Sequence, residues 1–170
     1  MPDPIVIRLA GEPRGKGRAR STMIRPKGRA PFISTYSQPE TAMYESHLRL
    51  AAQDAMEGRM PLSGQLQVVI LARFSIPASW SARKQKEARL GLLRPTKKPD
   101  FDNIAKLCDP MNKVVWTDDA IIVDGAVRKL FGEAPELVFI VSHAVSLGAA
   151  SVRPDLVRFD QAEMFAGAPG

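Results

Sequence analysis

The chain has 170 residues, enough for one domain with a buried core, and its 45% hydrophobic and 25% charged residues exclude a wholly disordered protein. Its formal net charge of +6 favours a polyanionic partner such as nucleic acid. A single cysteine excludes an intrachain disulfide and a multi-cysteine zinc site. There is neither an apolar run of the roughly 20 residues a membrane span needs nor a signal-peptide pattern, so we expect a cytoplasmic protein with no membrane partner.

The first third of the chain predicts a strand, a basic loop and a helix. Ile5–Leu9 is short, β-branched and alternating, which is typical of a strand. Residues 12–31 carry seven Lys or Arg between Arg14 and Arg29 with no acid among them, and their glycines and prolines predict a flexible loop or flap. The apolar spacing over residues 38–58, with proline in the first turn, predicts a helix that ends near Gly58.

We interpret the basic loop as a DNA contact. Seven like charges within sixteen residues repel one another unless an anion is present, and glycine lets the backbone approach phosphates closely. Lys16, Arg18 and Arg20 alternate, so in an extended segment they would follow one phosphate backbone. The alternative is a solvated run of charges.

A second strand and a short basic helix are predicted next. Gly64–Ile76 alternates apolar residues on one face, as in a strand. Ser79 is a suitable cap for a helix that Gly91 closes. Seven Lys or Arg lie between Arg83 and Lys98 against one acid, so this cluster is either the wet face of the helix or a further DNA contact.

The remainder predicts a third helix, two strands and a tail. The helix should start at Asp100 and kink or stop at Pro110, which cannot donate a hydrogen bond to the carbonyl of Lys106. Ile121–Phe131 and Leu137–Val145 read as strands on either side of a turn at 132–135. We therefore expect one domain over residues 1–147, with a loosely ordered tail at 148–170 that is rich in Gly, Ala and Pro.

Carboxylates gather from two segments of the chain. Asp100 and Asp102 are two residues apart at the end of an extended approach, where alternate side chains share a face. Asp118 and Asp119 follow a short apolar step that ends in Trp116. One helix cap needs only one such residue, and a second nearby carboxylate adds repulsion unless a cation offsets it. Acidic clusters in a basic protein therefore indicate a hard-cation site on a polyanion-binding surface, as in a metal-dependent nuclease.

Lys106 lies four residues after Asp102, so the two side chains share one helical face. A surface ion pair of this kind is worth only about 0–1 kcal/mol. The functional alternative places the ammonium beside a scissile phosphate, where it stabilises developing negative charge or helps to position the attacking water.

The segment KPDFDNIAKLCDPMNKVVWTDDAIIVD, residues 98–124, resembles the core signature of the RusA family of Holliday-junction resolvases. That signature reads [KR]-x-D-x-D-N-x-x-K, followed by V-W-x-D-D-x-x-V-x-D. PRGKGRAR, residues 13–20, resembles the Lys/Gly/Arg-rich opening of the family, and the resemblance covers roughly residues 4–147. Pro110 and the tail after about Gly148 depart from the family pattern.

The resemblance implies an α/β domain of the α+β type, with a mixed four-stranded sheet and helices packed against it. It further implies a homodimer that binds four-way DNA junctions and nicks two strands symmetrically with Mg²⁺, Mn²⁺ being possible. The catalytic residues it implies are Asp100, Asp102, Asp119 and Lys106, and the three aspartates are the implied ligands of one or two metal ions. The expected DNA contacts are Lys16, Arg18, Arg20, Lys97 and Lys98. Residues expected to support the ligands are Asn103, Asp118 and Asp124, although Asp118 is also suited to a turn and Asp124 to a structural role.

Two other functions stay open: a branched-DNA-binding module without cleavage, and a nuclease for other branched DNA. The intact aspartates argue against the first, because a binder gains nothing from anions beside DNA phosphates. We expect Trp116 to be a core residue or a dimer-interface anchor, and Cys108 to be a small buried hydrophobe.

Overall fold

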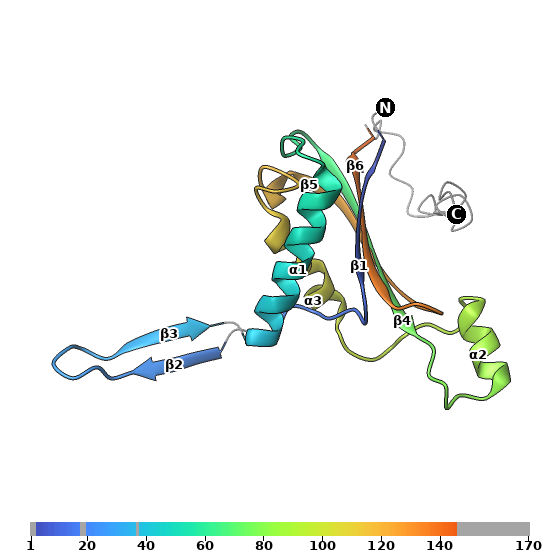
Figure 1. Cartoon of the computed structure of the whole chain (residues 1–170), viewed down its shortest axis with the longest axis horizontal. Helices are drawn as coiled ribbons and strands as arrows, with labels where there is room; N and C mark the ends of the chain where they lie inside the picture. The colour runs from blue at the N-terminus through green and yellow to red at the C-terminus, as the bar shows by residue number, and fades with distance from the viewer. Residues whose placement is uncertain (1–2, 18–19, 37, 146–170) are drawn as a thin grey trace.

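A four-stranded mixed sheet forms the centre of the protein (Figure 1). The structure is a computed structural model and describes residues 3–17, 20–36 and 38–145. The strands are β1 (Ile5–Ala10), β4 (Leu66–Ser75), β5 (Ile122–Gly132) and β6 (Glu136–His143), in the order β1-β6-β4-β5. β4 pairs with β5 in parallel and with β6 antiparallel, and β6 pairs antiparallel with β1. The predicted α+β class and the four predicted strands are confirmed, with ends that differ by one or two residues.

β5 and β6 are consecutive in the chain but not neighbours in the sheet. β5 ends at Gly132, opposite Ser75 of β4, and β6 begins at Glu136, opposite Arg73 of β4. The short connection between β5 and β6 therefore crosses the end of β4. β4 therefore has a partner on each side and is buried along most of its length.

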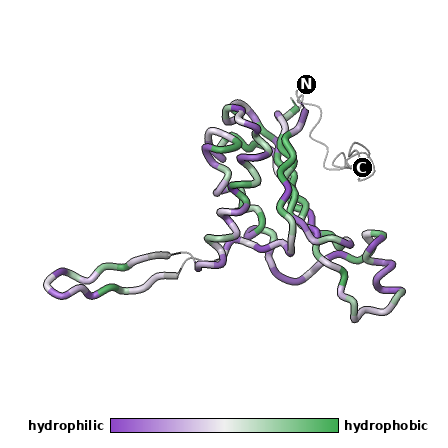
Figure 2. The backbone as a smooth tube through the Cα atoms, viewed as in Figure 1, coloured by the Kyte–Doolittle hydropathy of each residue, from purple (hydrophilic) through white to green (hydrophobic). Residues whose placement is uncertain are grey.

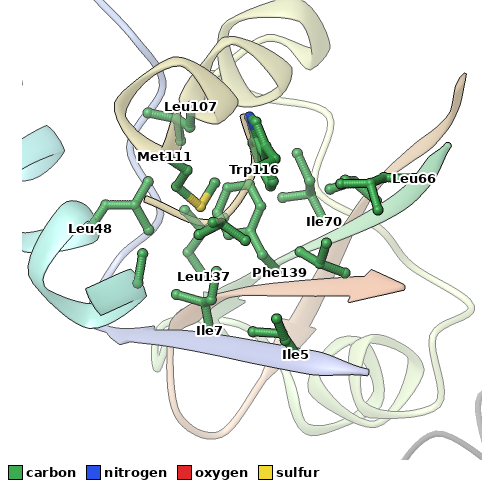
Figure 3. Packing of buried hydrophobic residues seen from close by; sticks show 14 of the residues in the cluster. Ile5, Ile7, Leu48, Leu66, Ile70, Leu107, Met111, Trp116, Leu137 and Phe139 are labelled. Atoms are coloured by element: carbon green, nitrogen blue, oxygen red, sulfur yellow. The ribbon is translucent and has the colours of Figure 1, made fainter. Parts of the chain in front are cut away.

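Helix α1 (Pro39–Met56) covers one face of the sheet, as Figure 1 shows. Its buried side chains are Leu48, Ala52 and Met56, at the helical spacing of four residues. They join the inward side chains of the strands in one core, part of which appears in Figure 3. The helix predicted over 38–58 is thus confirmed.

Trp116 lies at the centre of this core, between Met111 and Phe139 (Figure 3). It is 0% exposed, and its indole N–H donates to Asn112 Oδ1 at 2.7 Å. The core role is confirmed. The alternative role as an interface anchor is wrong, because a side chain buried within its own chain has no surface left for a partner.

The predicted basic loop is partly a β-hairpin. β2 (Arg20–Ile24) pairs antiparallel with β3 (Phe32–Tyr36), and the hairpin projects away from the sheet (Figure 1). The two strands are rich in β-branched and aromatic residues, which favour pairing, while Gly28 takes a positive φ of 78° in the turn. The prediction of a loop gave too much weight to glycine, proline and charge.

The short helices begin and end where local chemistry requires. α2 (Ala82–Arg89) is capped by Ser81, whose hydroxyl accepts from the Lys84 N–H, rather than by Ser79. α3 (Phe101–Ala105) starts after Asp100, as predicted, and passes at Lys106 into the 3₁₀ helix η1 (Lys106–Met111), which contains Pro110. The predicted interruption is confirmed, because proline has no N–H for an α-helical bond.

None of the helices in the described ranges combines the length and the apolar character that crossing a membrane requires. The predicted tail, 148–170, lies outside the described residues.

Candidate active site

The segment 100–107, which includes α3, presents two carboxylates and an ammonium to solvent and is anchored in the core. Ile104 and Leu107 are both 0% exposed and anchor the segment. Asp100, Asp102 and Lys106 are all exposed on the same segment. The local sequence therefore separates an apolar anchor from a charged outer face.

Asp100 occupies the N-cap position of α3 without acting as a side-chain cap. Its backbone is extended, with φ −75° and ψ 158°, and its carbonyl accepts from the Ile104 N–H at 3.1 Å. No N–H of α3, all of whose residues the structure describes, donates a capping bond to the Asp100 carboxylate. The capping interpretation thus does not account for this side chain.

Asp102 and Lys106 form the predicted pair along one helical face. Lys106 Nζ donates to Asp102 Oδ2 at 2.9 Å, and the two side chains are 62% and 54% exposed. This hydrogen bond, more than any other cause, lowers the pKa of Asp102 below its usual value. Asp102 is therefore an anion at neutral pH with a cation beside it.

The segment Arg14–Gly17 packs directly on the start of α3. The Lys16 N–H donates to the Asn103 carbonyl at 2.7 Å. A Cβ atom at Gly15 would lie 2.8 Å from Pro99 Cβ and 2.9 Å from Asn103 Cβ, so only glycine permits this approach. In the structure this glycine serves contact with protein, whereas the sequence suggested contact with phosphate.

Lys16 is tied to two carboxylates. Its Nζ lies 2.7 Å from Asp109 Oδ2 and 3.5 Å from Glu45 Oε1, and the hydrogen bond to Asp109 raises the pKa of Lys16. Sequence reasoning missed Asp109 and Glu45. Asp109 was visible in the sequence only as one of six acidic residues between Lys97 and Asp124. No local pattern linked it to Lys16, which lies 93 residues earlier.

A cleft of about 640 Å³ joins the basic loop to the acidic segment. Its walls include Arg14, Lys16, Lys98, Asp100 and Asn103. Four residues predicted for the site, Lys16, Lys98, Asp100 and Asn103, are therefore brought together. A carboxylate in such a cleft is surrounded by cations that attract phosphate.

The second acidic pair divides its roles between neighbours. Asp118 caps the 3₁₀ turn η2 (Asp119–Ile121), its Oδ1 accepting from the Ala120 N–H at 3.0 Å. Asp119 is exposed at the first position of that turn. Burial, followed by the negative charges of Asp109 and Asp119, raises the pKa of Cys108 to about 12. The contribution of Asp119 indicates that it lies near η1, the element that contains Cys108. That thiol is half-buried against the core and stays protonated at neutral pH, as expected of a small hydrophobe.

The three predicted metal ligands are not gathered into one cluster. Among the described residues, no group of three or more His, Cys, Asp or Glu side chains is arranged to hold a metal ion. Asp102 pairs with Lys106 rather than with another carboxylate through a shared site. In chemistry the donors nevertheless suit a hard cation, because exposed carboxylate oxygens are the ligands that Mg²⁺ prefers.

The other predicted residues are dispersed around this cleft or lie outside the described residues. Lys97 is exposed, and its carbonyl accepts from the Lys129 ammonium. Asp124 is exposed on β5, in register with Gln67. Arg18 lies outside the described residues, and of Arg20 the structure describes only the backbone, at the start of β2.

The family comparison decides the identity. The family model described as Endodeoxyribonuclease RusA matches residues 10–141, which is most of the chain. The chain belongs to the RusA endodeoxyribonuclease family. Membership in the RusA family implies an endodeoxyribonuclease that acts on Holliday junctions. A relative described as "Uncharacterized protein YqaN", from Bacillus subtilis (strain 168), is 32% identical over 142 residues, covering 82% of this chain and 96% of its own length.

Proposed function

We propose that this RusA-family protein is a Mg²⁺-dependent endodeoxyribonuclease that resolves four-way junctions by paired, symmetric nicks in DNA recombination and repair. The observation that carries this proposal is the Asp100 carboxylate, which is exposed and not used as a cap. It lies in a basic cleft, two residues before Asp102, which pairs with Lys106.

Asp100, Asp102 and Asp119 would hold the metal, with Mn²⁺ as a possible substitute. When bound, the ion lowers the pKa of a water molecule and neutralises charge on the leaving oxygen. Asp118 supports Asp119 by capping the turn that carries it. Asn103 supports Asp100 from the same cleft wall, and Asp124 is proposed to act from the neighbouring strand.

Lys106 is proposed to stabilise negative charge on the phosphate in the transition state. Asp102 holds its ammonium at 2.9 Å, on the exposed face that also carries the carboxylates. A positioned cation of this kind needs no reorganisation during the reaction.

The DNA-binding surface extends from this cleft. Lys98 lines it, and Lys97 is the residue immediately before Lys98. Lys16, Arg18 and Arg20 lie on the segment that leads from the cleft into the hairpin. The hairpin adds the exposed cations Arg25, Lys27 and Arg29 near its turn. In Figure 2 the hairpin turn is hydrophilic, whereas both strands carry hydrophobic stretches.

The proposed active form is a homodimer, because paired nicks need two sets of carboxylates and one chain supplies one set. The isolated hairpin supports this. Met23, Phe32 and Ile33 are 57%, 53% and 68% exposed, and a lone two-stranded hairpin is marginally stable in water. Burial of these apolar side chains by a second subunit would remove them from water and stabilise the hairpin.

A nicking assay tests the proposal. We expect wild-type protein in Mg²⁺ to nick a four-way junction at opposed positions, leaving linear duplex of the same sequence intact, with no cleavage in EDTA. Junction binding without cleavage in either Mg²⁺ or Mn²⁺ would favour a binding module. Equal cleavage of flaps or forks would favour a broader branched-DNA nuclease.

A further inference from the structure

A second cavity of about 420 Å³ shares Lys98 with the cleft as a lining residue. Three aromatic side chains from separate parts of the chain line it: Phe74 at the end of β4, Trp80 in the turn before α2, and Phe131 at the end of β5. All three are partly exposed, and Phe74 also packs against the edge of the core. The proposed chemistry of junction cleavage uses none of them.

The rings are held in place by their neighbours. Trp80 and Phe131 meet edge to face, with ring centroids 5.1 Å apart and planes at 73°. The backbone of Trp80 is fixed as well: its carbonyl accepts from the Gln85 side-chain amide at 2.9 Å, and its backbone N–H donates to the Pro77 carbonyl at 3.1 Å. The aromatic wall is therefore formed before any ligand arrives.

Cations surround this aromatic wall. Lys84, Arg94, Lys97 and Lys98 line the cavity, and all four are exposed. Lys84 Nζ lies 4.0 Å from the centroid of the Trp80 ring. Among the described residues that line the cavity, Glu12 alone is acidic, and its carboxylate already accepts from the Ser75 N–H and hydroxyl. The cavity thus offers π surfaces beside a net positive rim.

Aromatic faces next to cations are the combination that binds single-stranded nucleic acid, with bases stacked on rings and phosphates on Lys or Arg. The volume is within the range of small-ligand cavities. Lys98 lines both this cavity and the cleft that holds Asp100, so one strand of DNA can pass from one to the other. An acidic peptide could pair with the cations of the rim, but it would place no flat ring against the aromatic side chains.

We propose that this aromatic cavity binds an unpaired nucleotide of the branched DNA, its base against Trp80 and its phosphates against Lys84 and Lys97. The inference rests on the proposed function for the identity of the polyanion. It adds that the protein senses opened base pairs next to the branch point. Unpaired bases are the least costly to extrude, so DNA with such bases binds more tightly than perfect duplex.

Tryptophan fluorescence tests the stacking directly. The chain has two tryptophans, and Trp116 is 0% exposed, so a base can reach only Trp80. Titration of the wild type with an eight-nucleotide oligothymidine in EDTA should quench the emission, whereas blunt duplex should not. Trp80→Phe should abolish the quenching and leave the emission of Trp116. Unchanged quenching in Trp80→Phe, or equal quenching by duplex, overturns the inference.

Affinity measurements add a matched pair of charge variants on one helix. Lys84→Ala should weaken oligothymidine binding several-fold and reduce its salt slope by about 0.7, the value for one phosphate contact on a single strand. Lys86→Ala removes one positive charge from an exposed residue of the same helix that is not among the described residues lining the cavity. We expect it to change the affinity and the salt slope much less than Lys84→Ala does. Identical effects in both variants would mean general electrostatics and contradict the cavity.

Trp80→Ala should weaken the same binding about tenfold, a loss of ~1.4 kcal/mol, which lies within the range for one stacked base. If thermal unfolding shows that this variant is not folded, Trp80→Phe and Lys84→Ala decide. The two proposals fail in different ways. Normal junction cleavage without quenching removes only the cavity, and quenching without metal-dependent cleavage removes only the nuclease mechanism.

Discussion

Four aspartates of the proposed site differ in what their side chains contact: Asp102 accepts from Lys106 and Asp118 caps the turn that carries Asp119, whereas Asp100 does not cap its own helix. Asp100→Asn, Asp102→Asn and Asp119→Asn would each remove one of the proposed anionic ligands, so we expect cleavage to fall by at least about a hundredfold with junction binding retained. Single-turnover cleavage and a gel-shift titration measure the two effects. Wild-type cleavage by both α3 variants would disprove the ligand assignment.

Asp118→Asn is the matched control in the second acidic pair. Its Oδ1 accepts from the Ala120 N–H, and an asparagine carbonyl retains that acceptor. We therefore expect a milder loss than for Asp119→Asn in the same assay.

Lys106 is expected to act on the rate rather than on affinity. Loss of one preorganised donor in a transition state typically costs about 10²–10³ in rate, whereas loss of an exposed ion pair costs little. Lys106→Ala should therefore slow single-turnover cleavage of prebound junction much more than it weakens binding. A normal rate would return Lys106 to a simple surface pair.

The same variant has a pH signature. Lys106 depresses the pKa of Asp102, so the favourable pair is present above the usual carboxyl range and is lost as pH falls through the lowered value. In Lys106→Ala we expect the pKa of Asp102 to rise towards its usual value, as measured by NMR titration of the carboxyl carbon. An unchanged pKa would contradict the 2.9 Å contact.

Gly15 is expected to tolerate no side chain. A Cβ atom there meets Pro99 and Asn103 below 3.0 Å, so Gly15→Ala should displace the loop and destabilise the protein by about 1–3 kcal/mol. Gly125→Ala is a control, because the nearest atom of the described chain, Val68 O, lies 3.8 Å from its Cβ position. Thermal unfolding compares the two, and equal midpoints would contradict the packing.

Among the elements, the hairpin β2–β3 carries exposed cations, in contrast to the paired lysine that precedes it. Lys16, before the hairpin, is engaged with Asp109, whereas Arg25, Lys27 and Arg29 are exposed near the turn. Replacing these three by Ala should weaken junction binding and flatten its salt dependence by roughly 0.9 for each duplex phosphate that the variant no longer neutralises. Arg59→Ala, at an exposed residue after α1, is a control for the loss of one surface charge away from the hairpin. An unchanged salt slope in the triple variant would exclude the hairpin from the DNA surface.

The elements themselves were predictable to the extent that their signals are local. α1, the interruption near Pro110 and the four sheet strands follow from spacing and from proline chemistry within a few residues. The hairpin was missed because glycines, prolines and charges around its turn outweighed two short strands of five residues each.

At the scale of the whole molecule, assembly is the main expectation. Trp116 is buried, so the exposed apolar hairpin residues Met23, Phe32 and Ile33 are the better candidates for a subunit contact. A stable two-fold interface should bury at least about 1,000 Å² in total. Light scattering should therefore give a dimer mass, and Ile33→Asp should shift it towards the monomer. A wild-type monomer that stays one-to-one on a junction would exclude paired nicking.

The functional groups available at the site can be predicted from local sequence. Its acidic pairs, Lys106 and the basic loop are all visible as local spacing, and Lys106 reaches Asp102 because one helical turn separates them. Contacts between residues far apart in the chain, in contrast, could be found only in the folded structure. Lys16 meets Asp109 across 93 residues, and Trp80 meets Phe131 where a turn comes back to the end of β5. Such contacts depend on the path of the whole chain around its core, and no local pattern encodes that path.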